Sequence, residues 1–213
     1  MKRKKKWWLI PIIVVGSLQL IMVIFVIVLI IGITNRSTDI SKYERYRRDI
    51  GEAEKYLPSL EEVDSYNPNK KLFSYQEKTE FIFASYGVSL FVDYNDEAYQ
   101  TIVNDYEINN DFLTDEEIER QLNSSYCDFP VKEFDYRNYH FKILVKPYLS
   151  GRYKSCKSFM FLGFDSVATN MAYLYFYDFD IDYTYEPKQG DTLEDRENAM
   201  IKMIKDYFLW QNL

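Results

Sequence analysis

The sequence predicts an α+β protein: an N-terminal transmembrane helix, then an antiparallel sheet of hairpins that helices cover on one face. Three observations predict this fold. An uncharged apolar run occupies residues 12–33, strand-like segments joined by short turns recur after residue 79, and capping boxes at Thr114 and Thr192 begin helices. Strands joined by tight turns pair antiparallel, and the helices that follow them pack as a second layer.

The first predicted element is a membrane-spanning signal-anchor helix within residues 7–34, a segment without a charged side chain. At a rise of about 1.5 Å per residue, residues 12–33 would extend about 33 Å, and the hydrocarbon core of a bilayer is about 30 Å thick. A cleaved signal peptide is the alternative, but its apolar region has only about 7–15 residues and ends at a small-residue cleavage site. The longer run, which lacks such a site, favours an uncleaved anchor.

Basic residues set the predicted orientation of this anchor. Five of them fill residues 2–6 and five more lie between residues 36 and 48, so the count on the two sides is equal. The first cluster is denser, and moving it outward would oppose the membrane potential by about 2.3 kcal/mol per charge per 100 mV. We therefore predict a single-pass protein of the cell membrane, with a cytoplasmic tail at residues 1–6 and an extracytoplasmic C-terminal domain.

The chain beyond the predicted anchor is acidic. The whole sequence has 26 Lys and Arg against 33 Asp and Glu, and removing residues 1–34 leaves 21 basic and 33 acidic residues, a net charge of −12. Such a surface repels phosphate, which excludes nucleic acid as a partner. The predicted partners are the lipid bilayer and a membrane or envelope protein, and no oligomeric state is predicted.

Residues 35–71 are predicted to form a juxtamembrane stalk helix and a linker. Apolar residues recur at spacings of three and four between Ile40 and Leu57, which predicts a helix over residues 39–57. Two heptads are too few for a coiled coil, so we expect this helix to pack against the protein's own domain. Pro58 ends the helix, and a turn at residues 67–69 precedes the domain at residues 72–213.

Within this domain, three hairpins and three helices are predicted. The hairpins pair residues 80–84 with 88–94 around a turn at Gly87, 131–136 with 139–145, and 158–164 with 171–182. The helices begin at Asn95, at Thr114 with Glu117, and at Thr192 with Asp195, where each N-cap residue precedes an apolar stripe.

Three aspartates on the last predicted strand form the candidate metal site. In residues 177–183 (YDFDIDY), Asp178, Asp180 and Asp182 project to one face of a strand, and a hard cation such as Ca²⁺ would relieve their repulsion. The run fails as an EF-hand loop, because Tyr183 stands where that loop needs glycine. The alternative, which we favour, is a core strand whose far end extends into solvent. No other cofactor is predicted.

Cys127 and Cys156 are the only cysteines, and both lie outside the predicted membrane segment, where thiols can be oxidised. A disulfide between them would close a loop of about 30 residues and contribute about 3.5 kcal/mol on the chain-entropy model. Two unpaired thiols that act as small apolar side chains are the alternative, and the sequence favours neither.

Signatures of enzymes are absent from the sequence. The single histidine, His140, lies among alternating apolar residues, where a structural role is the expected one. The chain has no phosphate-binding glycine loop, no nucleophile elbow and no zinc-protease motif. We therefore do not predict an enzyme.

The layout resembles that of uncharacterised single-pass membrane proteins of Gram-positive bacteria. The resemblance is carried by the basic start, the single apolar segment, residues 56–60 (YLPSL), residues 81–83 (FIF) and residues 172–183 (AYLYFYDFDIDY). It implies a location and no activity. The function expected is therefore that of a binding or interaction protein at the cell envelope. The alternative is an envelope-acting enzyme or a cation-dependent module that uses Asp178, Asp180 and Asp182.

Overall fold

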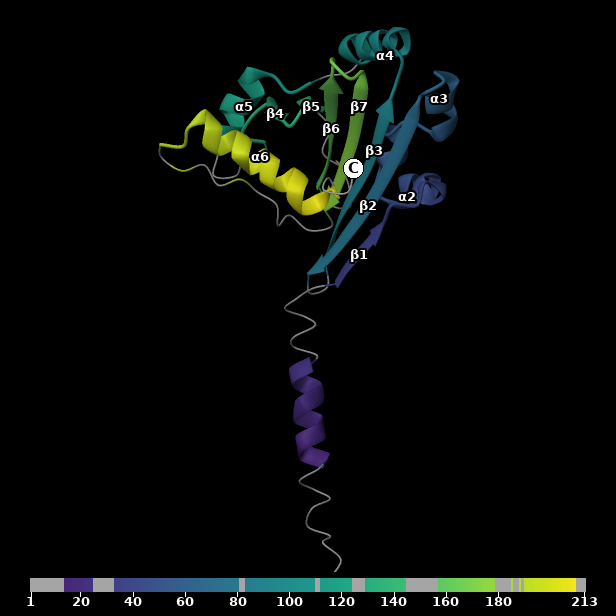
Figure 1. The fold of residues 1–213 in the computed structure, drawn as a ribbon. Helices are drawn as coiled ribbons and strands as arrows, with labels where there is room; N and C mark the ends of the chain where they lie inside the picture. The colour runs from purple at the N-terminus through teal and green to yellow at the C-terminus, as the bar shows by residue number, and fades with distance from the viewer. Residues whose placement is uncertain are drawn as a thin grey trace, which may run out of the picture.

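The computed structural model describes residues 14–24, 33–80, 83–109, 112–123, 129–144, 157–178, 185, 188 and 190–209. These residues form an α+β fold around a seven-stranded antiparallel sheet with the order β1-β2-β3-β7-β6-β5-β4 (Figure 1). The strands are β1 (Ile33–Ser37), β2 (Lys70–Glu80), β3 (Phe83–Asp93), β4 (Glu133–Tyr136), β5 (Tyr139–Leu144), β6 (Lys157–Asp165) and β7 (Asn170–Asp178). The predicted class and the antiparallel pairing are confirmed.

The helices outside the N-terminal segment are mostly short. They are the 3-10 helices η1 (Ile40–Lys42) and η2 (Ala53–Lys55) and the α-helices α2 (Tyr43–Asp49), α3 (Leu60–Ser65), α4 (Asp96–Asn109), α5 (Asp115–Leu122) and α6 (Leu193–Tyr207). All three predicted N-caps are confirmed. The side chains of Asn95, Thr114 and Thr192 accept from backbone amides of the first turn, and the last two form reciprocal capping boxes.

Two of the three predicted hairpins are confirmed. Arg137 and Asn138 connect β4 to β5, with Arg137 at a φ of 55°, and residues 166–169 connect β6 to β7. The turn predicted at Gly87 is wrong, because Gly87 lies in the middle of β3, between Gln76 of β2 and Phe176 of β7. A Cβ atom at this position would lie 2.0 Å from the backbone oxygen of Tyr207, so glycine permits the end of α6 to approach the sheet.

Helices cover both faces of the sheet, which corrects the prediction of one covered face. Successive residues of β7 alternate between two hydrophobic clusters: Tyr173 and Tyr175 pack on the side of α2, α3 and α4, whereas Leu174 and Phe176 pack on the side of α5 and α6 (Figure 1). All four side chains are at most 1% exposed. The central strands are therefore apolar on both faces, a pattern that predicts burial on two sides.

The segment predicted as a stalk helix is divided into several elements that belong to the sheet domain. Instead of one helix over residues 39–57, η1, α2 and η2 follow one another, and Gly51 at a φ of 51° separates α2 from η2. The expected packing on the protein's own domain is confirmed, since the buried side chains of Tyr43, Ile50 and Leu57 join the core. Strands β1 and β2, which were not predicted, pair with each other at one edge of the sheet.

The predicted membrane segment, residues 7–34, lies only in part within the described residues. Residues 14–24 are helical, and Ile33 and Thr34 belong to β1. Among the residues that the structure describes, no helix combines the length and the apolar character needed to cross a membrane.

Candidate functional site

Of the three aspartates predicted to hold a cation, only Asp178 lies in the described part of the chain. It ends β7 on the α6 side of the sheet, is 1% exposed, and accepts a hydrogen bond of 3.1 Å from the Ser85 hydroxyl of β3. Asp180 and Asp182 lie outside the described residues, as do Cys127 and Cys156. Within the described residues, no group of three or more His, Cys, Asp or Glu side chains is placed to hold a metal ion.

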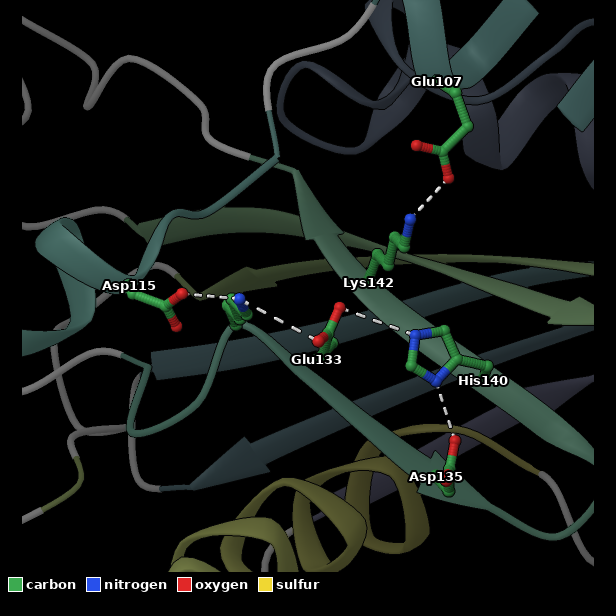
Figure 2. Close-up of polar contacts among 7 residues, drawn as sticks. Glu107, Asp115, Glu133, Asp135, His140 and Lys142 are labelled. Atoms are coloured by element: carbon green, nitrogen blue, oxygen red, sulfur yellow. Dashed lines mark hydrogen bonds and ion pairs between the residues drawn. The ribbon is translucent and has the colours of Figure 1, made fainter. Parts of the chain in front are cut away.

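His140 lies in a polar cluster on the hairpin of β4 and β5 (Figure 2). Its Nδ1 atom is 2.8 Å from Asp135 Oδ1, and its Nε2 atom is 3.6 Å from Glu133 Oε2. The strand register causes this arrangement, since Asp135 is directly opposite His140 and Glu133 is opposite Lys142. Side chains of alternate residues share one face of the hairpin, so all four lie on the same side.

Two lysines connect this hairpin to neighbouring helices (Figure 2). Lys132 Nζ is 2.7 Å from Asp115 Oδ2 at the start of α5, and Lys142 Nζ is 2.5 Å from Glu107 Oε1 near the end of α4. Because each cation bridges separate elements, the cluster orients α4 and α5 relative to the hairpin. Such partly exposed ion pairs contribute about 0–1 kcal/mol each to stability.

The chemistry of the cluster supports this structural role for His140. Its seven members, four carboxylates, two lysines and the imidazole, include no hydroxyl or thiol that the imidazole could activate as a nucleophile. The two ring nitrogens face different carboxylates on opposite sides of the ring, so Glu133, Asp135 and His140 do not converge on one point. The ring is 43% exposed, at the surface rather than in an enclosed cavity.

A cavity of about 200 Å³ lies between the sheet and the helices α3 and α4. We call it the tyrosine cavity, because five tyrosines line it. Each comes from a different element or its end: Tyr56 after η2, Tyr66 after α3, Tyr94 after β3, Tyr106 in α4 and Tyr173 in β7. Lys55, Glu62 and Asp105 also line it, together with the apolar residues Pro58, Val63, Ile102 and Leu144.

The rings of the tyrosine cavity are inclined to one another and extend into the core. The centroids of Tyr66 and Tyr94 are 6.3 Å apart with planes at 84°, and those of Tyr106 and Tyr173 are 5.9 Å apart at 54°. The hydroxyls of Tyr94 and Tyr173 are 3.3 Å apart and share a hydrogen bond. Burial raises the pKa of Tyr94 to about 12, so this phenol is neutral at physiological pH.

Acidic side chains add to the effect of burial in this cavity. The pKa of Tyr106 is raised first by burial and then by the negative charge of Glu62, with smaller contributions from Tyr94 and Asp105. The same carboxylate of Glu62 raises the pKa of Tyr94. Glu62 therefore favours the neutral form of both phenols, in the same direction as burial.

Two further cavities lie at other places on the domain. One of about 350 Å³ lies beside the β4–β5 turn and includes Lys70, Asp93 and Arg137. Another of about 490 Å³ lies between α2 and the sheet and includes Arg45, Asp49 and Glu77. All three cavities have both cations and anions in their lining, and the one beside α2 also has four tyrosines. The tyrosine cavity has the most tyrosines and the smallest volume of these three.

No local pattern of residues indicates the tyrosine cavity. Its tyrosines are spread from residue 56 to residue 173, and the chain has 20 tyrosines in total. Comparison of the chain with protein-family models, with curated proteins and with solved structures produced no match.

Proposed function

We propose that this protein is a single-pass, membrane-anchored binding protein whose α+β domain lies on the extracytoplasmic side and takes up a ligand or partner at the cell envelope. The observation that carries the anchor is the exposure of residues 14–24. Eight large apolar side chains of this helical segment, from Val14 to Ile24, are 49–67% exposed. A contiguous apolar surface of this kind is unfavourable in water, so it has to contact another apolar surface. Because the segment is uncharged and follows a cluster of basic residues, a lipid bilayer is the best match for that surface.

The binding role is supported by the tyrosine cavity. Binding sites for small molecules are concave, and aromatic side chains with a few polar groups line them. The tyrosine cavity has this composition and reaches Tyr94 and Tyr173, which are each 1% exposed. The His140 cluster has a structural explanation and adds no chemistry of its own, so a binding role accounts for more of the domain than an enzymatic one does.

Membrane fractionation combined with protease accessibility tests the anchored topology. We expect the full-length chain, tagged at its C-terminus, to remain in the membrane pellet after alkaline carbonate extraction. Protease added to intact cells with an accessible membrane surface should remove the tagged domain. Recovery of a polypeptide that starts near residue 35 from the medium would contradict the anchor, and full protection of the tag would contradict the orientation.

The cation-dependent alternative is tested separately. If Asp178 and the aspartates that follow it form a Ca²⁺ site, millimolar Ca²⁺ should raise the melting temperature of the full-length protein in detergent, because a ligand that binds only the folded state stabilises it. An unchanged melting temperature would eliminate the Ca²⁺ site and leave the proposed binding function in place.

A further inference from the structure

We propose that the tyrosine cavity binds a small organic ammonium ion, a proposal that specifies the ligand class for the binding function inferred above. The cavity combines inclined aromatic rings with carboxylates at its opening. This combination recognises positive charge on an apolar body, since the face of an aromatic ring attracts a cation within about 6 Å of its centroid.

The carboxylates of Glu62 and Asp105 give the tyrosine cavity its negative charge. Among the residues that the structure describes, neither has a lysine or arginine partner, and Asp105 accepts only from the Asn109 side-chain amide, at 2.6 Å. Lys55 is the cation among the described residues of the cavity lining, and it is paired with Glu52. The cavity therefore has a surplus of negative charge, which favours a cation over an anion.

The aromatic rings limit the shape of the ligand that the tyrosine cavity can accept. The ring planes of Tyr66 and Tyr94 are inclined by 84° and those of Tyr106 and Tyr173 by 54°, so the cavity is lined by rings of different orientation. A rounded alkylammonium group can contact several such faces at once. A flat aromatic ligand could stack face to face on one ring of an inclined pair but not on both.

The size of the cavity limits the ligand further. Its volume of about 200 Å³ is below the range of about 300–1,000 Å³ that is usual for drug-sized ligands. The ligand, or the part of it that enters, is therefore an ammonium group with a few carbon atoms. A bulkier remainder would extend past Glu62 and Asp105, both of which are exposed to solvent.

Calorimetric titration of the full-length protein in detergent micelles tests this proposal. The probe is tetramethylammonium chloride, and tert-butanol serves as a neutral probe of similar shape, with sodium chloride matched in all samples. We expect saturable binding of tetramethylammonium and at least tenfold weaker binding of tert-butanol. Equal binding of the two probes would overturn the ammonium assignment while leaving a binding cavity, and no binding of tetramethylammonium at tens of millimolar would also overturn it.

Variants separate charge from ring contacts. We expect the double substitution of Glu62→Gln and Asp105→Asn to weaken tetramethylammonium binding at least tenfold, and Glu61→Gln, on the same helix but outside the cavity lining, to leave it within twofold. At Tyr66, the change to Phe should preserve binding within threefold and the change to Leu should weaken it about tenfold. Unaltered melting temperatures establish that each variant is folded. Unchanged affinity in the double variant would refute the proposal, whereas the membrane anchor is tested independently by fractionation.

Discussion

Replacing Gly87 with alanine tests how closely α6 is docked on the sheet. The added Cβ atom would lie 2.0 Å from the backbone oxygen of Tyr207 and 3.2 Å from the ring of Phe208. Carbon and oxygen atoms approach each other to about 3.3 Å without repulsion, so the end of α6 has to move by about 1.3 Å. Because the obstacle is backbone, a change of side-chain rotamer cannot relieve it.

The expected cost follows from what this movement disturbs. Overpacking in a well-packed core costs about 1–3 kcal/mol. Loss of the 2.5 Å hydrogen bond from Gln76 Nε2 to the Asp206 carbonyl adds about 1 kcal/mol. Reduced freedom of the unfolded chain offsets about 0.4–1 kcal/mol, since alanine has fewer backbone conformations than glycine. Gly87→Ala should therefore lower the free energy of unfolding by about 1–3.5 kcal/mol.

Denaturant unfolding of the full-length protein in micelles, followed by circular dichroism, measures this change. Gly16→Ala is the matched control, because a Cβ atom at Gly16 has no neighbour within 4 Å, and it should leave the transition of the domain unchanged. A loss of less than about 0.5 kcal/mol in Gly87→Ala would refute the close docking of α6 on β3.

Three further predictions address the polar groups of the domain. His140→Gln should change the free energy of unfolding by less than about 1 kcal/mol, because the contacts of His140 with Glu133 and Asp135 are exposed, and a loss above about 2 kcal/mol in denaturant unfolding would contradict the weak, surface character of these contacts. Tyr43→Phe should cost about 1–2 kcal/mol in the same assay, because the buried hydroxyl donates to the Pro58 carbonyl at 2.7 Å, and no loss would contradict that bond. Burial raises the pKa of Tyr94 and of Tyr175 from 10.0 to about 12, so the folded state keeps protons that the unfolded chain releases near pH 10. Stability should hold below pH 10 and fall between pH 10 and 12, and a constant unfolding midpoint up to pH 12 would contradict this.

Local signals in the sequence predicted the elements that depend on a few neighbouring residues. The capping boxes at Thr114 and Thr192 and the hairpin turn at Arg137 and Asn138 each involve two to four positions, and the structure confirms all three. Such features are determined by hydrogen bonds and backbone angles within the segment itself. Distant parts of the chain have little influence on them.

Features that depend on distant contacts could not be predicted in the same way. From the sequence alone, Gly87 resembles a turn residue. In the structure, the carbonyl of Tyr207, 120 positions further along the chain, occupies the space that a Cβ atom at position 87 would need. The tyrosine cavity requires α3, α4 and β7 to meet, and no short pattern encodes that meeting. One available signal was overlooked: the apolar run of residues 171–176 indicates a strand buried on both faces, and it would have predicted helices on both sides of the sheet.

The pairing of β1 with β2 has a mechanical consequence for a chain held by its N-terminal segment. β1 runs antiparallel to β2, from Ile33 opposite Thr79 to Ser37 opposite Tyr75. A pull on Ile33 that is directed along the strand loads the ladder in shear, so its hydrogen bonds share the load at the same time. Under such a load, tension is transmitted to the sheet as a unit instead of separating one residue pair after another, and the domain moves with the segment that holds it.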